Sequence, residues 1–277
     1  MRRLNRPQFT AIDVLNLCLE SIRDEQLTGR LRLVGGELAA AEATYVERAN
    51  QQELFQIPQT IGIGGVSVNE MKRVYKDTFA KSVRTRNIYD QIKKLPINDI
   101  CPMCGQRTVG SLDHYLAQSL HSALVVAPVN LVPACNDCNK TKLDAQPRTA
   151  AEQTLHPYFD NVEDEMWLYA AVEETRPASV RFYPEAPPNW CPLNKERVNN
   201  HFRTFGLGAL YAAHSGVELT SIRYGLQKIA EGGTSEQIRA ELFRRAESAK
   251  AAHINAWQTA MYFALARSDW FCEGGFN

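Results

Sequence analysis

The chain lacks a surplus of charge of either sign. Its 277 residues include 31 Lys and Arg against 31 Asp and Glu, so the formal net charge at pH 7 is zero. A zero net charge excludes a globally basic nucleic-acid binder and leaves only a local binding surface. Low-complexity tracts and internal repeats are also missing, while 44% of the residues are hydrophobic. This composition excludes a disordered tail or a collagen-like fibre and supplies enough apolar material for one or two cores.

Export and membrane signals are missing as well. The basic start Met1-Arg2-Arg3 leads into a stretch interrupted by Asp13 and Glu20, unlike the apolar segment of a signal peptide. One run, 115–136, carries no Asp, Glu, Lys or Arg, but it contains polar residues and two prolines, so we interpret it as protein interior. We therefore expect an intracellular, cytoplasmic protein with no membrane partner. The sequence does not indicate its oligomeric state.

Four of the seven cysteines form two Cys-x-x-Cys pairs, Cys101/Cys104 and Cys135/Cys138. An odd cysteine count argues against a disulfide framework, and the repeated pair favours zinc. Two tight turns with two thiolates each complete a tetrahedral shell with no open position for water, so the predicted zinc site is structural. The alternatives are a thioredoxin-like redox pair and buried unligated thiols.

Helix signals lie on both sides of these cysteines, and they divide the chain into three regions. We predict a helical region at 1–95, a central core at 96–160, and a helical region at 161–277 that is suited to partner docking. The helices are expected to start at capping motifs, namely Thr10-x-x-Asp13, Ser67-x-x-Glu70 and Thr234-x-x-Gln237. One long amphipathic segment is expected after Thr234, and Gly62, Gly64 and Gly65 predict a turn.

The second of these helices has an apolar face and precedes an uneven charge distribution. Its face is expected to comprise Met71, Val74, Tyr75, Phe79 and Val83. Residues 71–110 carry nine basic side chains against three acidic ones, and this block reaches the first cysteine pair. Such a block forms either a solvated helix face or a binding surface, and its position beside the zinc pair favours the latter. We interpret the acidic block at 160–175 as a solvated helix face, and the Pro-rich stretch 176–194 as an extended connection with a short strand at 179–183.

The segment between and after the cysteine pairs contains a further set of polar residues. Its members are Asp113-His114, Asn130 and Asn139-Lys140-x-Lys142. Thirty residues, 105–134, separate the pairs, more than the roughly 15 to 20 of an ordinary zinc ribbon. In this order the residues resemble the HNH, or ββα-metal, nucleases in their zinc-braced form, over 101–142. Asn139 stands where many members have His, so the chain resembles an HNN variant.

The resemblance implies an α+β fold in which a mainly helical chain surrounds a zinc-stapled ββα core. It implies a metal-dependent endonuclease that hydrolyses phosphodiester bonds of DNA, by nicking or by cutting both strands. His114 would activate water, and Asp113 and Asn139 would hold Mg²⁺ or Mn²⁺ through oxygen. Asn130 would hydrogen-bond the loop backbone and fix the orientation of His114. Lys140 and Lys142 would bind phosphates of the substrate.

The chemistry of the reaction explains these residue types. A phosphodiester resists water because the nucleophile must lose a proton and negative charge builds on the phosphoryl and leaving oxygens, so a base and a cation are needed. Neighbouring side chains alternate along a strand, so Asp113 is expected to face the helix that carries Asn139 and His114 to face the attacking water. We expect His121 at the surface and His156 in a packing role.

A fainter resemblance extends beyond the core. Asn87-Ile88-Tyr89-Asp90, Asn130-Leu131-Val132-Pro133 and His156-Pro157-Tyr158 resemble segments of HNH proteins encoded beside an ATPase in Septu-type anti-phage systems. This resemblance implies an ATPase partner and a role in defence. Two alternatives remain: a catalytically silent zinc-dependent module that binds nucleic acid or a partner and needs no His114, and a redox protein that uses Cys-x-x-Cys.

Overall fold

The computed structural model describes residues 1–142 and 146–277, apart from the side chain of Lys142. The chain divides into two compact units, Met1–Asp160 and Asn161–Asn277. Unit 1 therefore contains both the predicted helical region 1–95 and the predicted central core 96–160. The mixture of helices and small sheets confirms the α+β class.

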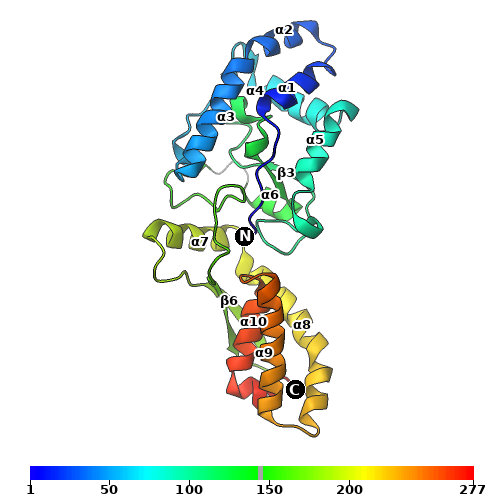
Figure 1. Cartoon of the computed structure of the whole chain (residues 1–277), viewed down its shortest axis with the longest axis vertical. Coiled ribbons are helices and arrows are strands. Elements are labelled where there is room, and N and C mark those ends of the chain that lie inside the picture. Colours follow the sequence, from blue (N-terminus) through cyan, green and yellow to red (C-terminus); the bar gives the residue numbers. More distant parts are fainter. Residues whose placement is uncertain (143–145) are drawn as a thin grey trace. The chain divides into compact units, whose positions relative to one another are not determined.

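Unit 1 contains six of the helices (Figure 1), and four of them begin at a residue whose side chain caps the helix. Thr10 and Asp13 form a capping box at the start of the first helix, and Ser67 and Glu70 form another before the fourth, as the sequence predicts. The helices of this unit are α1 Ala11–Leu19, α2 Glu25–Leu33, α3 Gly35–Asn50, α4 Val68–Arg73, α5 Val83–Lys93 and α6 Asn136–Lys142. Short 3₁₀ turns are η1 Leu54–Gln56, η3 Ile97–Asp99, η4 Ser122–Leu124 and η5 Pro128–Asn130.

The predicted glycine turn is present in unit 1. It joins β1 Gly62–Ile63 to β2 Val66–Ser67, which pair in antiparallel fashion. Gly64 and Gly65 have φ values of 48° and 79°, a left-handed conformation that glycine adopts without strain.

Helix α4 does not continue as a regular helix, which corrects one expectation. It passes into a π-helical turn, η2 Val74–Phe79, and the chain then restarts as α5. Met71, Val74 and Phe79 are buried, but Val83 lies beyond the break and is 92% exposed. Val83 is the first residue of α5, which begins after the N-cap Ser82, so it does not continue the apolar face of α4 and η2.

The centre of unit 1 is a strand–strand–helix arrangement. Strands β3 Ser111–His114 and β4 Leu131–Ala134 form an antiparallel pair in which Asp113 lies opposite Val132 and His114 opposite Leu131. Helix α6 follows β4 after a single residue. Residues 121–135 are all buried, which confirms the interpretation of the uncharged run as interior.

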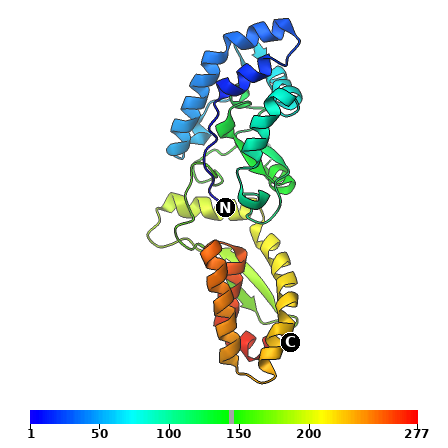
Figure 2. The ribbon, with the colours of Figure 1, turned by 45° about the vertical axis from the view of Figure 1, so that its right-hand side comes forward.

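Unit 2 is built around a second hairpin (Figure 2). Strands β5 Leu168–Glu173 and β6 Ser179–Pro184 pair over their whole length, and α10 covers β5 while α8 covers β6. The helices are α7 Pro192–Thr204, α8 Leu207–Ala230, α9 Ser235–Ala252 and α10 Trp257–Arg267, followed by the π turn η6 Phe271–Gly275.

Two expectations for unit 2 are wrong. The acidic block is no helix face, because β5 occupies its second half and Glu173 pairs with Arg181 of β6 at 2.9 Å. The amphipathic segment after Thr234 is two helices, with a break before α10. At this break Asn255 accepts hydrogen bonds from the backbone N–H of Trp167 and Leu168, and it donates to the carbonyls of Val162 and Glu165. These long-range bonds favour an interrupted helix, and helical periodicity alone does not reveal them.

Candidate metal centre and adjoining cleft

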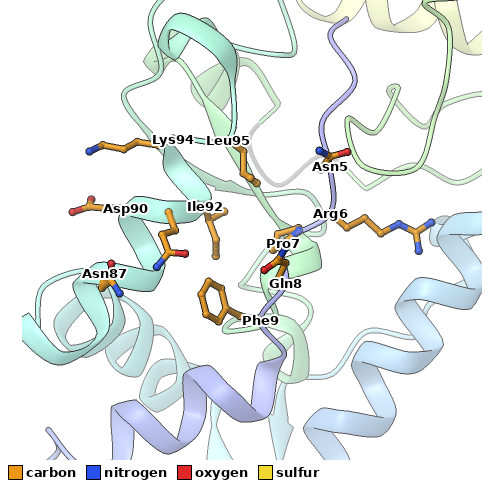
Figure 3. Close-up of a pocket in the computed structure, with 11 residues that line it drawn as sticks. Asn5, Arg6, Pro7, Gln8, Phe9, Asn87, Asp90, Ile92, Lys94 and Leu95 are labelled. Atoms are coloured by element: carbon orange, nitrogen blue, oxygen red, sulfur yellow. The ribbon is translucent and has the colours of Figure 1, made fainter.

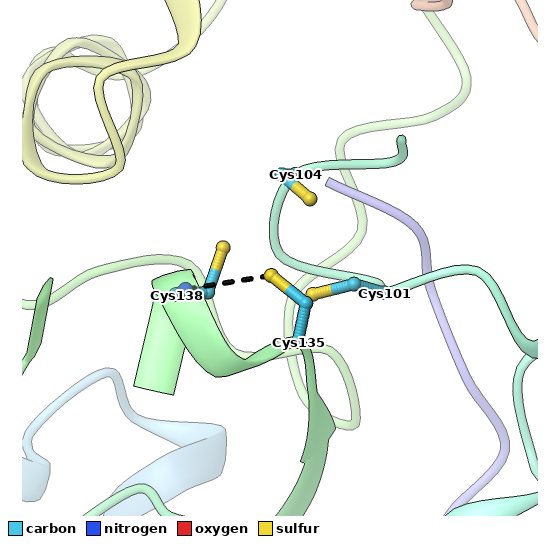
Figure 4. Close-up of side chains that lie close together, drawn as sticks. All are labelled: Cys101, Cys104, Cys135 and Cys138. Atoms are coloured by element: carbon cyan, nitrogen blue, oxygen red, sulfur yellow. Dashed lines mark hydrogen bonds between the residues drawn. The ribbon is translucent and has the colours of Figure 1, made fainter. Parts of the chain in front are cut away.

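The four cysteines of the two pairs converge in the fold (Figure 4). Cys101 and Cys104 lie in the turn before β3, Cys135 directly follows β4, and Cys138 lies in the first turn of α6. All four are buried, and their Sγ atoms lie within 4.8 Å of one another. A tetrahedral zinc with Zn–S bonds of about 2.3 Å needs sulfur–sulfur separations of about 3.8 Å, so the quartet fits zinc after a small contraction.

Backbone N–H groups support negative charge on these sulfurs. The N–H of Arg107 donates to Cys104 Sγ at 3.5 Å, and the N–H of Cys138 donates to Cys135 Sγ at 3.4 Å. Hydrogen bonds among the four thiols, helped by these N–H groups, lower the pKa of Cys104 and bring that of Cys135 to about 6. The same network raises the pKa of Cys101 and Cys138, so negative charge collects on Cys104 and Cys135. Gly105, at φ 63°, closes the first turn. The quartet therefore has the chemistry of a structural zinc site.

Among residues 1–142 and 146–277, a search for three or more His, Cys, Asp or Glu side chains close enough to hold a metal finds this quartet. The arrangement supports structural zinc, the coarser part of the sequence prediction. It favours zinc over a redox pair, because a redox pair does not need a second Cys-x-x-Cys at the same point.

Asp113 and His114 lie at the end of β3. Their burial alternates along the strand, with Asp113 half-buried and His114 only 8% exposed. Both nevertheless line the same cleft, about 560 Å³ in volume, which also receives Asn139 and Lys140 from α6. The expected separation of the two side chains onto opposite sides is therefore incomplete, because the strand ends at His114.

The ring of His114 is held by two contacts. Its Nε2 lies 2.9 Å from the carbonyl oxygen of Val125. A carbonyl only accepts, so Nε2 carries the proton and the lone pair of the neutral ring is on Nδ1. The ring of Tyr75 meets the imidazole edge-on, with centroids 4.5 Å apart and planes at 68°. These contacts restrict rotation of the imidazole.

Asn130 organises the loop that carries Val125. This side chain is fully buried; its Oδ1 accepts from the N–H of Leu116 at 2.7 Å. Its Nδ2 donates to the carbonyls of Leu116 and Leu124, at 3.1 and 3.2 Å. Asn130 thus joins the two ends of the loop between β3 and β4, next to the carbonyl that binds His114.

Asn139 lies in α6, one turn from the zinc ligand Cys135. Its backbone N–H donates to the Cys135 carbonyl at 3.0 Å, and its Nδ2 donates to Ser111 Oγ at 3.1 Å. The bond to Ser111 fixes the orientation of the Asn139 amide group and leaves Oδ1 on the side of the group away from Ser111. Lys140 is exposed beside it in the cleft lining. The side chain of Lys142 lies outside the described part of the chain.

The cleft lining includes two side chains with oxygen donors, the ligand type that hard divalent ions prefer. Asp113 supplies a carboxylate and Asn139 a carboxamide oxygen, and Mg²⁺ takes one or two protein ligands while keeping several waters.

Tyr75 lines the cleft as well, although its helical spacing in the sequence had placed it in the core and given it no role in the site. Burial raises the pKa of Tyr75, so it stays protonated, and its hydroxyl donates to the Leu112 carbonyl at 3.3 Å.

The two other histidines considered in the sequence analysis, His121 and His156, are both buried. His121 is 1% exposed, contrary to the expected surface position, because the backbone at 121 bridges to Thr60 and encloses the ring. Burial lowers the pKa of His121. His156 is also 1% exposed, and its ring accepts from the N–H of Tyr158 at Nδ1 and bonds the Tyr45 hydroxyl at Nε2. His156 therefore packs in the core, as expected.

A second cavity of about 470 Å³ lies elsewhere in unit 1 (Figure 3). It is enclosed by the extended segment 5–9 and by α5, and Arg6 points away from it toward α3. Arg6 stacks on Phe159 at 4.1 Å and donates to Asn50. The described lining contains neither histidine nor cysteine, so this cavity lacks the chemistry of the cleft.

The comparisons with known proteins give one similar protein. No protein-family model matches the chain, and no solved structure matches it. Protein ea31 of Escherichia phage lambda is 26% identical over 297 aligned residues, which cover 99% of this chain and 100% of that protein. The name of this relative states no activity. Among the described helices, none combines the length and the apolar character that a membrane crossing requires.

Proposed function

We propose that the chain is a metal-dependent endonuclease that hydrolyses phosphodiester bonds of DNA. The observation that carries this proposal is the cleft. It combines an imidazole of defined tautomer, a carboxylate, a carboxamide and lysine side chains next to a four-cysteine cluster. These are the groups that phosphodiester hydrolysis requires: a base, oxygen ligands for a cation, and positive charge for phosphate.

His114 is the general base in this mechanism. With its Nε2 proton held by the Val125 carbonyl, the imidazole takes a proton from water at Nδ1. Asp113 and Asn139 would hold Mg²⁺, or Mn²⁺ in its place, and the bound ion supplies charge stabilisation at the phosphate and the leaving oxygen. Lys140 neutralises backbone phosphate. Asn130 keeps the loop closed, so that the Val125 carbonyl stays within reach of His114.

Plasmid cleavage tests the proposal. The purified, zinc-loaded chain is incubated with supercoiled plasmid in Mg²⁺ or Mn²⁺, beside His114→Ala, an EDTA control and His253→Ala. His253 is an exposed histidine at the end of α9 in unit 2, so its replacement is a matched control. We expect cleavage by wild type and His253→Ala, and at least about a 100-fold loss in His114→Ala with zinc content unchanged.

Equal cleavage by His114→Ala would remove His114 from the mechanism. If the folded, zinc-loaded wild type cleaves nothing with either ion, the silent binding module becomes the better description. The resemblance to Septu-type proteins adds an ATPase partner in anti-phage defence to this proposal. Co-purification with an ATPase encoded beside the gene, and a change of cleavage on adding it, would support that extension.

A further inference from the structure

The cleft has a second wall, which comes from outside the strand–strand–helix centre. Four residues of the η2 region line it, in two pairs five positions apart: Tyr75 with Ala80, and Lys76 with Lys81. Both lysines are exposed, and they belong to the basic block of residues 71–110. Sequence reasoning located this block beside the zinc pair without indicating which of its nine cations face the site.

The π-helical turn explains the spacing of five. The N–H of Ala80 donates to the carbonyl of Tyr75 at 2.9 Å, a bond between residues i+5 and i. In a regular α-helix, at about 100° per residue, positions five apart point about 140° away from each other. The π turn instead brings Tyr75 and Ala80 to one face, and Lys76 within the turn and Lys81 directly after Ala80 both line the cleft. Such turns occur frequently at functional sites.

The charge of the cleft is positive on both walls. Lys76 and Lys81 on one wall and Lys140 of α6 supply three cations, and Asp113 is the one acidic residue in the described lining. Lys81 also pairs with Asp77 at 3.2 Å, but both side chains are more than half exposed. An exposed pair of this kind is weak, so the ammonium group can exchange the carboxylate for a phosphate.

Other cations of the same block are held by acidic partners away from the cleft. Arg84 pairs with Glu20 at 2.7 Å, Arg86 with Asp90 at 3.0 Å, and Arg107 with Asp137 at 2.8 Å. The positive charge that faces the candidate catalytic groups therefore comes from Lys76 and Lys81 and not from the block as a whole.

We propose that Lys76 in the π turn and Lys81 directly after it bind the phosphodiester backbone of duplex DNA in the cleft that Lys140 also lines. This inference rests on the proposed nuclease function and names the substrate contacts of its site. The two lysines bind phosphates in the ground state and the transition state alike, so their loss raises KM and leaves kcat nearly unchanged.

The test measures binding of a short fluorescent DNA duplex, without Mg²⁺ or Mn²⁺, as a function of salt. The variants are K76Q/K81Q and a control, K72Q/K93Q, which removes the same charge from the same block outside the cleft lining. A third variant, D77K/K81D, keeps the net charge and the Asp–Lys pair but withdraws the cation from the cleft. Each lost phosphate contact lowers the slope of log K against log salt by about 0.9.

We expect K76Q/K81Q to lose at least about tenfold in affinity at 0.1 M salt and about 2 in slope, and D77K/K81D to lose affinity as well. The control should bind as wild type does. If K76Q/K81Q matches the control while His114-dependent cleavage persists, this inference is wrong and the nuclease stands. Binding that depends on the two lysines without any plasmid cleavage supports the inference and contradicts the nuclease. A wild type that binds no DNA overturns both.

Discussion

The two units support the same motif, a two-stranded antiparallel hairpin, in different ways. An isolated hairpin of two strands is marginally stable in water, so each needs a partner. In unit 1 the four-residue strands β3 and β4 are tied by the cysteine quartet and by the buried side chain of Asn130. In unit 2 the six-residue strands β5 and β6 are covered by helices α8 and α10.

This difference concerns function as well as stability. In unit 2 most residues of β5 stay half-buried under their helices, whereas β4 of unit 1 is buried along its whole length and a cleft lies at the end of β3. Unit 1 therefore combines a short hairpin with the cleft that His114 lines, and unit 2 has an apolar core that includes Trp167 and Phe271. The comparison predicts that the two units respond separately to metal, to core mutation and to pH.

The largest expected effect is the loss of a zinc ligand. Cys135→Ser should unfold unit 1 and leave the thermal transition of unit 2 in place, because structural zinc contributes on the order of 10 kcal/mol or more to folding. Calorimetry with zinc analysis measures this. Cys191→Ser is the matched control, since Cys191 is an exposed cysteine of unit 2. An unchanged unit 1 transition in Cys135→Ser would contradict the zinc staple.

The converse change is made in the core of unit 2. Trp167 is 1% exposed, and its Nε1 donates to the Val162 carbonyl at 3.0 Å. Trp167→Ala should cost about 3 to 5 kcal/mol through the cavity and the lost hydrogen bond. Zinc content and plasmid cleavage should stay at the wild-type level at temperatures where unit 2 is still folded. Loss of zinc in this variant would show that the two units do not fold independently.

Each unit contains a buried asparagine, and replacing the two separately compares a loss of stability in unit 2 with a loss of both stability and cleavage in unit 1. Asn130 in unit 1 and Asn255 in unit 2 each bind several backbone groups, so replacement of either by Ala leaves buried groups unpaired and should cost about 2 to 4 kcal/mol. Only Asn130→Ala should also reduce cleavage, because its loop carries the carbonyl that holds His114. Equal kcat in the two variants, measured below both melting points, would exclude a positioning role for Asn130.

The smallest expected effect is a pH dependence in unit 2. Hydrogen bonds from Arg244 and Arg245 lower the pKa of Glu241 below its ordinary value. A lowered folded pKa gives stability that is present above the unfolded pKa, about 4.3, and is lost as pH falls through the folded value. The unit 2 transition should drop below about pH 4 by less than about 1 kcal/mol, and not in Glu241→Gln. Unit 1 should fall at higher pH, when its thiolates take up protons and release zinc.

Local signals in the sequence were sufficient for several features. Capping motifs located the starts of α1, α4 and α9, because the bonds involved span only three residues. The Gly64-Gly65 turn and the pairing of Cys101/Cys104 with Cys135/Cys138 are equally readable, since backbone conformation and ligand chemistry require those residue types. The α+β class was implied by the resemblance to the HNH nucleases, and the structure confirms it. The activity itself stays a prediction.

Features that depend on partners distant in the chain could not be predicted from the sequence. Strand β5 forms because β6 pairs with it, and the break before α10 is favoured by Asn255 binding backbone groups 87 to 93 residues away. Buried positions of His121 and exposure of Val83 depend in the same way on what packs around them.

The sequence by itself determined the four cysteines that could hold zinc and the helix starts, because each follows from short-range spacing and side-chain chemistry. Only the tertiary structure decided which groups meet in the cleft. The π turn after α4 and the residues directly after it bring Tyr75, Lys76 and Lys81 to the cleft, out of a helix and a basic block that look uniform in sequence. One additional residue in a helical turn changes the directions in which the following side chains point, and these directions decide which side chains face the cleft.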